Sequence, residues 1–126
     1  MGRPISSRKV LTSFSAPMLT TVGAELLIVG NPLLSTLDLS VLRTIGSDLW
    51  LGNNNALSSL ASFGDKPGGT LDVAVLGSFL DVNGNPMLCQ ADVNLLVTAV
   101  QTHATSPFGG SINTSANDTA CVTPTF

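Results

Sequence analysis

The sequence of 126 residues has no tyrosine, one histidine, two cysteines and few charges, and these scarcities exclude several classes of function. Charged residues make up 10% of the chain, and only 5 of them are Lys or Arg. Nucleic-acid binding needs clustered Lys and Arg to neutralise phosphates, so we expect no nucleic-acid partner. No apolar run reaches the roughly 18–20 residues of a transmembrane helix, so we also expect no membrane span.

Side chains suited to catalysis or metal binding are equally sparse. A catalytic nucleophile needs a base within reach, yet His103 is the one histidine, and the Ser and Thr residues follow no catalytic motif. A structural zinc site needs four ligands, which two cysteines and a distant histidine do not supply. We therefore expect a protein that is not an enzyme and has no cofactor and no metal site. His103 is expected to be a surface residue at the end of a helix.

The chain is rich instead in apolar residues and in internal repetition. Hydrophobic residues make up 44% of it, which is enough for one domain with its own core. A pattern recurs at residues 23–34, 46–57 and 77–89, with a weaker copy at 109–117. The copies begin 23, 31 and 32 residues apart. Self-similarity at a nearly constant period predicts a solenoid of stacked rungs.

Each copy contains an apolar alternation followed by a turn signal. A period of two is typical of a strand with one buried face, so the alternating residues are expected to point inward. An Asn follows each strand at a bend rich in Gly, Asn and Pro, where its amide can satisfy backbone groups. The inward residues are Leu26 and Ile28, Leu49 and Leu51, Leu80 and Val82, and Ile112 and Thr114; the Asn ladder is Asn31, Asn54, Asn85 and Asn117.

Two further segments complete the expected architecture. Val93, Leu96, Val97 and Val100 in residues 89–103 follow the spacing of one helix face, which predicts a C-terminal capping helix. Residues 61–70 are rich in Gly and Pro and interrupt the repeat, so we expect an exposed loop there. Together these features predict a β-rich α/β solenoid, a short β-helix-like or leucine-rich-repeat-like stack of about four rungs with one C-terminal capping helix.

The N-terminal end of the expected stack begins partway through a repeat. Residues 11–22 supply only half a unit, so the first rung presents an apolar edge that must be covered. Residues 1–10, expected to be a frayed or truncated start, are one candidate cover; a partner and further N-terminal repeats are the alternatives. The alignment pairs Phe14 with Leu37, Leu19 with Leu42 and Val22 with Ile45.

The two cysteines occupy equivalent positions in neighbouring copies. Cys89 follows Asn85 by four residues, and Cys121 follows Asn117 by four. Adjacent strands lie about 4.8 Å apart, which matches the Cα separation of about 4.4–6.8 Å that a disulfide requires. The spacing predicts a disulfide, with two free core thiols as the alternative. A disulfide would indicate an extracellular or cell-surface protein, although residues 1–19 contain no clear signal peptide.

The pattern Val/Ile-Gly-x-x-Leu-x-Ile-x-x-Asn-Pro-x-Leu resembles the receptor L-domain family. The order at the C-terminal end is also similar: Asn-Pro-x-Leu-Cys, a helix, a Gly-rich strand, Asn-Asp and Cys. That family includes ligand-binding lobes of the insulin and epidermal-growth-factor receptors and many microbial surface proteins. The resemblance implies a right-handed solenoid over residues 11–121, a tail at 122–126, and binding or adhesion rather than catalysis.

The outward face of the expected sheet is the candidate binding site. Trp beside Leu and Val makes an exposed apolar patch, and tryptophan is enriched at binding hot spots. Acidic residues flank this patch. Two of them, Glu25 and Asp48, are expected to lie about 5 Å apart on adjacent strands. We interpret this pair as part of a solvated face rather than as a Ca²⁺ site or an acid–base pair. We expect a non-catalytic recognition or adhesion module for a protein or carbohydrate ligand; the alternative is a structural fragment of a larger surface protein without a ligand of its own. The candidate residues are Glu25, Leu27, Val29, Asp48, Trp50 and Phe79.

Overall fold

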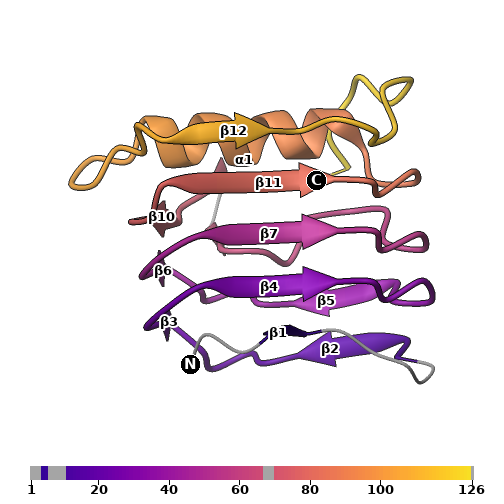
Figure 1. Cartoon of the computed structure of the whole chain (residues 1–126), viewed down its shortest axis with the longest axis horizontal. Coiled ribbons are helices and arrows are strands. Elements are labelled where there is room, and N and C mark those ends of the chain that lie inside the picture. The colour runs from indigo at the N-terminus through magenta and orange to yellow at the C-terminus, as the bar shows by residue number, and fades with distance from the viewer. Residues whose placement is uncertain (1–3, 6–10, 67–69, 126) are drawn as a thin grey trace.

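A computed structural model describes residues 4–5, 11–66 and 70–125 of the chain. Over these residues the chain is strand-rich, with twelve strands and one α-helix arranged as three parallel sheets and an antiparallel hairpin (Figure 1). The strands are β1 (Pro4–Ile5), β2 (Ser13–Ser15), β3 (Thr21–Val22), β4 (Leu26–Val29), β5 (Thr36–Asp38), β6 (Thr44–Ile45), β7 (Leu49–Gly52), β8 (Asp65–Lys66), β9 (Thr70–Leu71), β10 (Ala74–Val75), β11 (Phe79–Asn83) and β12 (Ser111–Asn113), and the helix is α1 (Gln90–Gln101).

The largest sheet has five parallel strands in the order β1-β4-β7-β11-β12. Leu49 of β7 lies opposite Leu26 of β4 and Leu80 of β11, and Leu80 lies opposite Ile112 of β12. This register confirms the alignment predicted from the four sequence copies. Alternate side chains of a strand point to opposite faces, so one face of β4, β7 and β11 is buried. Its fully buried or nearly buried residues are Leu26, Ile28, Leu49, Leu51, Leu80 and Val82.

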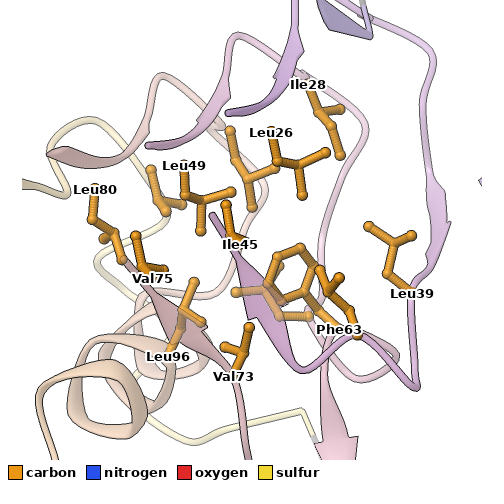
Figure 2. Packing of buried hydrophobic residues seen from close by; sticks show 14 of the residues in the cluster. Leu26, Ile28, Leu39, Ile45, Leu49, Phe63, Val73, Val75, Leu80 and Leu96 are labelled. Carbon is orange, nitrogen blue, oxygen red and sulfur yellow. The ribbon is translucent and has the colours of Figure 1, made fainter. Parts of the chain in front are cut away.

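Two smaller parallel sheets lie behind the large one in Figure 1. One has the order β10-β6-β3, and the other pairs β2 with β5. Phe14 lies opposite Leu37, and Val22 lies opposite Ile45, as the half-repeat at residues 11–22 predicts. The core fills the space between the sheets, where Leu residues of the large sheet point toward Ile45 and Val75 (Figure 2).

The expectation of an exposed loop at residues 61–70 is wrong for its first half. Phe63 is fully buried and forms a one-residue parallel bridge with Leu39. The backbone N–H of Leu39 donates to the carbonyl of Ser62, and that of Gly64 donates to the carbonyl of Leu39. The aromatic ring enters the core beside Val73 and Leu39 (Figure 2) because burying its apolar surface outweighs the turn preference of its Gly-rich neighbours. Later residues of this insertion, relative to the shorter repeat, contribute to the β8–β9 hairpin.

Helix α1 lies behind β12 in Figure 1, at the end of the large sheet. Val93, Leu96 and Val100 are buried on its inner face, and Val97 packs at the edge of the core, which confirms the helical periodicity. His103 lies two residues beyond the helix, and its side chain is 17% exposed, so it is partly covered and not the open surface residue that the sequence predicts. Its Nε2 lies 3.5 Å from a carboxylate oxygen of Asp72.

No helix in the described part of the chain has the length and apolar character needed to cross a membrane.

The predicted Asn ladder is present at the bends that follow the strands. Each ladder Asn is buried, and the side-chain oxygens of the later members accept hydrogen bonds from the backbone of the preceding copy. The N–H of Asn31 donates to Oδ1 of Asn54 at 3.2 Å, and the N–H of Asn54 donates to Oδ1 of Asn85 at 3.1 Å. The N–H of Asn85 continues the series to Oδ1 of Asn117 at 3.4 Å. The ladder therefore satisfies polar groups that the turns carry into the interior.

A residue with positive φ precedes every ladder Asn and turns the chain into the bend. Gly30 and Gly84 adopt this conformation without a steric penalty, since they lack a Cβ atom. Asn53 has a φ of 57° and belongs to a residue type that tolerates it. Ala116 has a φ of 59°, and unlike Asn53 it has no polar side chain that can offset the steric cost of this conformation.

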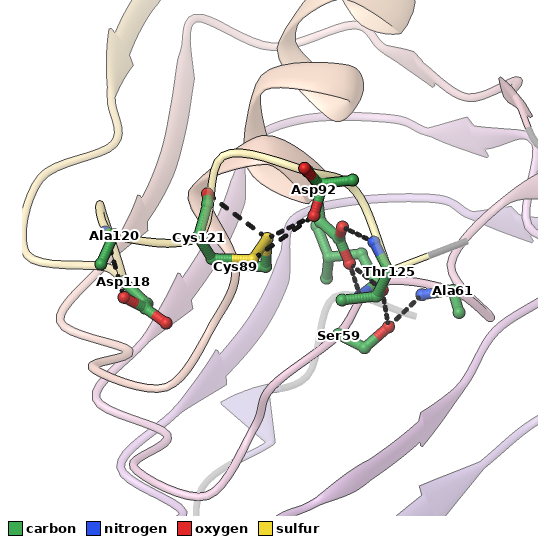
Figure 3. Close-up of a disulfide and its surroundings, with 10 residues drawn as sticks. Ser59, Ala61, Cys89, Asp92, Asp118, Ala120, Cys121 and Thr125 are labelled. Atoms are coloured by element: carbon green, nitrogen blue, oxygen red, sulfur yellow. Dashed lines mark hydrogen bonds between the residues drawn. A yellow bond between two sulfur atoms is a disulfide. The ribbon is translucent and has the colours of Figure 1, made fainter.

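The predicted disulfide joins Cys89 to Cys121, with a Cα–Cα distance of 5.0 Å (Figure 3). A buried carboxylate beside it anchors the residues that the sequence marks as a tail. Asp92 accepts hydrogen bonds from the N–H and hydroxyl of Thr125, at 2.8 and 2.6 Å, and from the N–H of Leu60 at 3.0 Å. The disulfide and Asp92 together tie the C-terminal segment to the first turn of α1.

The edge of β4 that the sequence leaves open is paired with β1. Pro4 lies opposite Leu27 and Ile5 opposite Ile28 in a parallel arrangement. Residues 1–3 and 6–10, the remainder of the expected frayed or truncated start, lie outside the described residues.

Candidate functional site

The outward face of the large sheet contains an open hollow of about 410 Å³. We call it the Trp50 hollow. The sheet register explains why residues distant in sequence meet there, because Leu27 lies opposite Trp50 and Trp50 lies opposite Asp81. Five of the six residues proposed from the sequence line it, and Val29 does not. The lining residues are Glu25, Leu27, Asp48, Leu49, Trp50, Phe79 and Asp81.

Two aromatic side chains give the Trp50 hollow its accessible apolar surface. Trp50 is 39% exposed and Phe79 is 52% exposed, whereas Leu27 is half-buried. An exposed tryptophan is not required by the core, which the inward residues of the same strands already fill. The exposed rings are therefore available for contact with another molecule.

Gly52 determines how the Trp50 side chain lies. The two residues are on the same face of β7, and a Cβ atom placed on Gly52 would lie only 2.5 Å from Nε1 of the indole. The pyrrole edge of the ring thus occupies the volume that a side chain at position 52 would need. Gly52 lies opposite Val29, so the indole extends from the row of Leu27 toward the row of Val29. The sequence places Gly52 on the outward face, but it does not show that the missing side chain of Gly52 leaves room for the indole.

Asp48 has a structural task that the sequence did not indicate. Its Oδ1 accepts hydrogen bonds from the backbone N–H of Ser78 at 2.8 Å and of Phe79 at 3.0 Å. Gly77 permits this approach, because a Cβ atom there would collide with the backbone of Ser47 and with the carboxylate of Asp48. Asp48 therefore holds the start of β11, which carries Phe79, and contributes its negative charge to the wall of the hollow.

The Trp50 hollow is acidic. Glu25 and Asp81 are half-exposed at its wall, and no hydrogen bond or ion pair joins either carboxylate to another described residue. Of the described residues that line it, none is Lys, Arg or His. Asp81 is absent from the candidate residues chosen from the sequence, although the alternation of β11 already places it on the outward face. Cross-strand pairing with Trp50 is what brings it into the site.

Other surface features are less developed. A second open hollow lies between residues 75–78 and 106–110, where the wall includes several Gly and Ser residues and the exposed side chain of Leu76. Within the described residues, no group of three or more His, Cys, Asp or Glu side chains is arranged to hold a metal ion.

Comparison with known proteins finds no matching family model, no matching curated protein and no matching solved structure.

Proposed function

We propose that this chain is a non-catalytic recognition or adhesion module that binds its ligand in the Trp50 hollow. The observation that carries the proposal is the exposed Trp50 side chain, seated over Gly52 in a concave, acid-lined part of an outward sheet face. Tryptophan contributes strongly to binding because it buries a large area with little loss of side-chain freedom. Protein and carbohydrate are the two ligand classes that such a surface suits.

We further propose that the architecture is a short right-handed solenoid of about four rungs, similar to the receptor L-domain family. Parallel pairing of β4, β7, β11 and β12 in matching register supports this proposal. The continuous Asn ladder supports it as well, since a ladder of identical side chains needs equivalent bends in successive copies. A solenoid of this kind presents a broad sheet face for binding.

An extracellular or cell-surface location belongs to the same proposal. The Cys89–Cys121 disulfide supports it, because disulfides persist mainly in oxidising compartments.

The test compares the wild-type chain with Trp50→Ala against a glycan array and in a pull-down with surface proteins. Leu33→Ala is the matched control, since Leu33 is 49% exposed and lies outside the Trp50 hollow. We expect saturable binding that the Trp50 variant loses and the Leu33 variant keeps, with both folds intact by circular dichroism. Unchanged binding by a folded Trp50→Ala protein would move the site elsewhere. A lack of saturable binding by the wild type would favour the structural fragment of a larger surface protein.

A further inference from the structure

We infer that the ligand of the Trp50 hollow is a cationic saccharide, an amino-sugar unit whose ring packs against Trp50 and whose protonated amine faces the carboxylates around it. This inference rests on the proposed function, which leaves the ligand class open. It follows from the negative charge of the hollow, from the indole surface that Trp50 presents, and from the small area of apolar surface around it.

The charge of the hollow selects a cationic ligand group. Glu25, Asp48 and Asp81 supply three carboxylates, and no cationic side chain of the described residues lies among the lining residues to balance them. Glu25 and Asp81 have no hydrogen-bond partner among the described residues, so a ligand can reach both carboxylates without displacing a hydrogen bond to any of those residues. An ammonium group gains charge-assisted hydrogen bonds there, whereas the carboxylate or sulfate of an acidic sugar is repelled.

The aromatic surface suits a sugar ring that carries such a group. Trp50 presents part of its indole to solvent, and its position over Gly52 keeps the ring close to the sheet rather than standing free. The C–H face of a pyranose can pack on an indole, and a nearby ammonium group is further attracted by the π-electrons of the ring. Phe79 extends the apolar surface on the neighbouring strand, where Asp48 holds the backbone of Phe79 in place.

The apolar surface is small for a protein partner. A stable protein–protein contact buries about 800 Å² on each side and usually has a desolvated apolar core. Apolar side chains on the outward face are concentrated at the hollow and its border. The outward positions beyond them on β11 and β12 are polar, namely Asn83, Ser111 and Asn113. A hollow of about 410 Å³ falls instead in the size range of small-ligand sites.

The test is a fluorescence titration, because Trp50 is the one tryptophan of the chain and reports directly on its own surroundings. The probes are a β-linked glucosamine oligosaccharide and its N-acetylated counterpart, which has the same ring and length but no charged amine. A Lys-rich peptide of matched net charge is the third probe. The variants are Glu25→Gln, Asp81→Asn and Gly52→Ala, with Asp118→Asn as the charge-matched control outside the hollow.

We expect the glucosamine oligosaccharide to change the fluorescence saturably and to bind more tightly than the N-acetylated probe. Each of Glu25→Gln and Asp81→Asn should weaken binding about two- to fivefold, the range for exposed ion pairs, and added salt should weaken it further. Gly52→Ala keeps the indole but displaces it, so it should weaken binding about tenfold. Asp118→Asn should bind like the wild type.

Equal affinity for the two oligosaccharides, or binding unaffected by Glu25→Gln and Asp81→Asn, would overturn the assignment of a cationic sugar. Binding of the Lys-rich peptide without either sugar would also overturn it, while leaving recognition through the Trp50 hollow intact. The proposed function itself would fail only if no ligand in the array or the pull-down depended on Trp50. The two failures are therefore distinguishable.

Discussion

The two faces of the large sheet are made from alternate residues of the same strands, yet they follow different rules. The inward row of Leu26, Leu49 and Leu80 keeps one residue type through three strands, and all three side chains are buried. In the outward row beside it, Leu27 is followed by Trp50 and then by Asp81.

The reason for this difference is physical. Inward side chains must fill a shared core between parallel sheets, where a change of size leaves a cavity or forces strain. Outward side chains meet solvent, so their shape and charge can vary without loss of packing. The inward face is aliphatic throughout, since its second row consists of Ile28, Leu51 and Val82, and this composition indicates what holds the fold together. The mixed composition of the outward face indicates where binding can occur.

The largest expected effect comes from breaking the inward face. Leu49→Ala should lower the free energy of unfolding by about 2–5 kcal/mol, because Leu49 is fully buried between Leu26 and Leu80. Trp50→Ala, one position away, should cost clearly less, since the indole is partly exposed. Chemical denaturation of both variants measures the contrast. Equal losses at the two positions would contradict the distinction between the faces.

The disulfide should be the next largest contributor, because it ties the segment that follows β12, a strand with two of its three residues exposed, to the start of α1. Replacing Cys89 and Cys121 together with Ser should lower the free energy of unfolding by about 3–4 kcal/mol in the chain-entropy model. Thermal unfolding of the double variant tests this value. The wild-type protein treated with a thiol reductant is the matched control and should show a similar loss; a reductant without effect would contradict the prediction.

An intermediate effect is expected at the bends that follow the strands of the large sheet. Asn54→Ala should lower the free energy of unfolding by about 2–3 kcal/mol, because it leaves the buried N–H of Asn31 and the carbonyl of Ile28 without their hydrogen bonds to Asn54. Asn55→Ala is the control, since Asn55 is exposed beside the ladder. Denaturation midpoints that fall equally for both variants would show that the ladder bonds contribute little.

The smallest expected effect is a stabilisation. Ala116 has positive φ at the bend where Gly30 and Gly84 stand in earlier copies, so Ala116→Gly should raise the free energy of unfolding by about 0.5–1 kcal/mol. The entropy that glycine adds to the unfolded chain limits the gain. Thermal unfolding detects the shift, and Ala120→Gly serves as a control at a position without positive φ. A lower midpoint for Ala116→Gly would show that the bend carries no relievable strain.

Much of this architecture could be predicted from the sequence because it depends on local periodicity and on equivalent spacing. The alternation of Leu49, Trp50 and Leu51 alone assigns their faces, and the common offset of the two cysteines from the Asn residues places them side by side. Of the six candidate residues that this alternation places on the outward face, all but Val29 line the Trp50 hollow, since a strand has only two faces.

Other features were decided by tertiary contacts that no local pattern encodes. The burial of Phe63, the anchoring of Thr125 by Asp92 and the partial covering of His103 each depend on a segment distant in sequence. The same is true of the site, where Asp48 bonds to the start of the next strand and Asp81 meets Trp50 across the sheet. The sequence by itself thus determined which residues face outward. Only the tertiary structure decided which of them share a hollow, because that depends on how the strands stack and on the volume that Gly52 leaves for the indole.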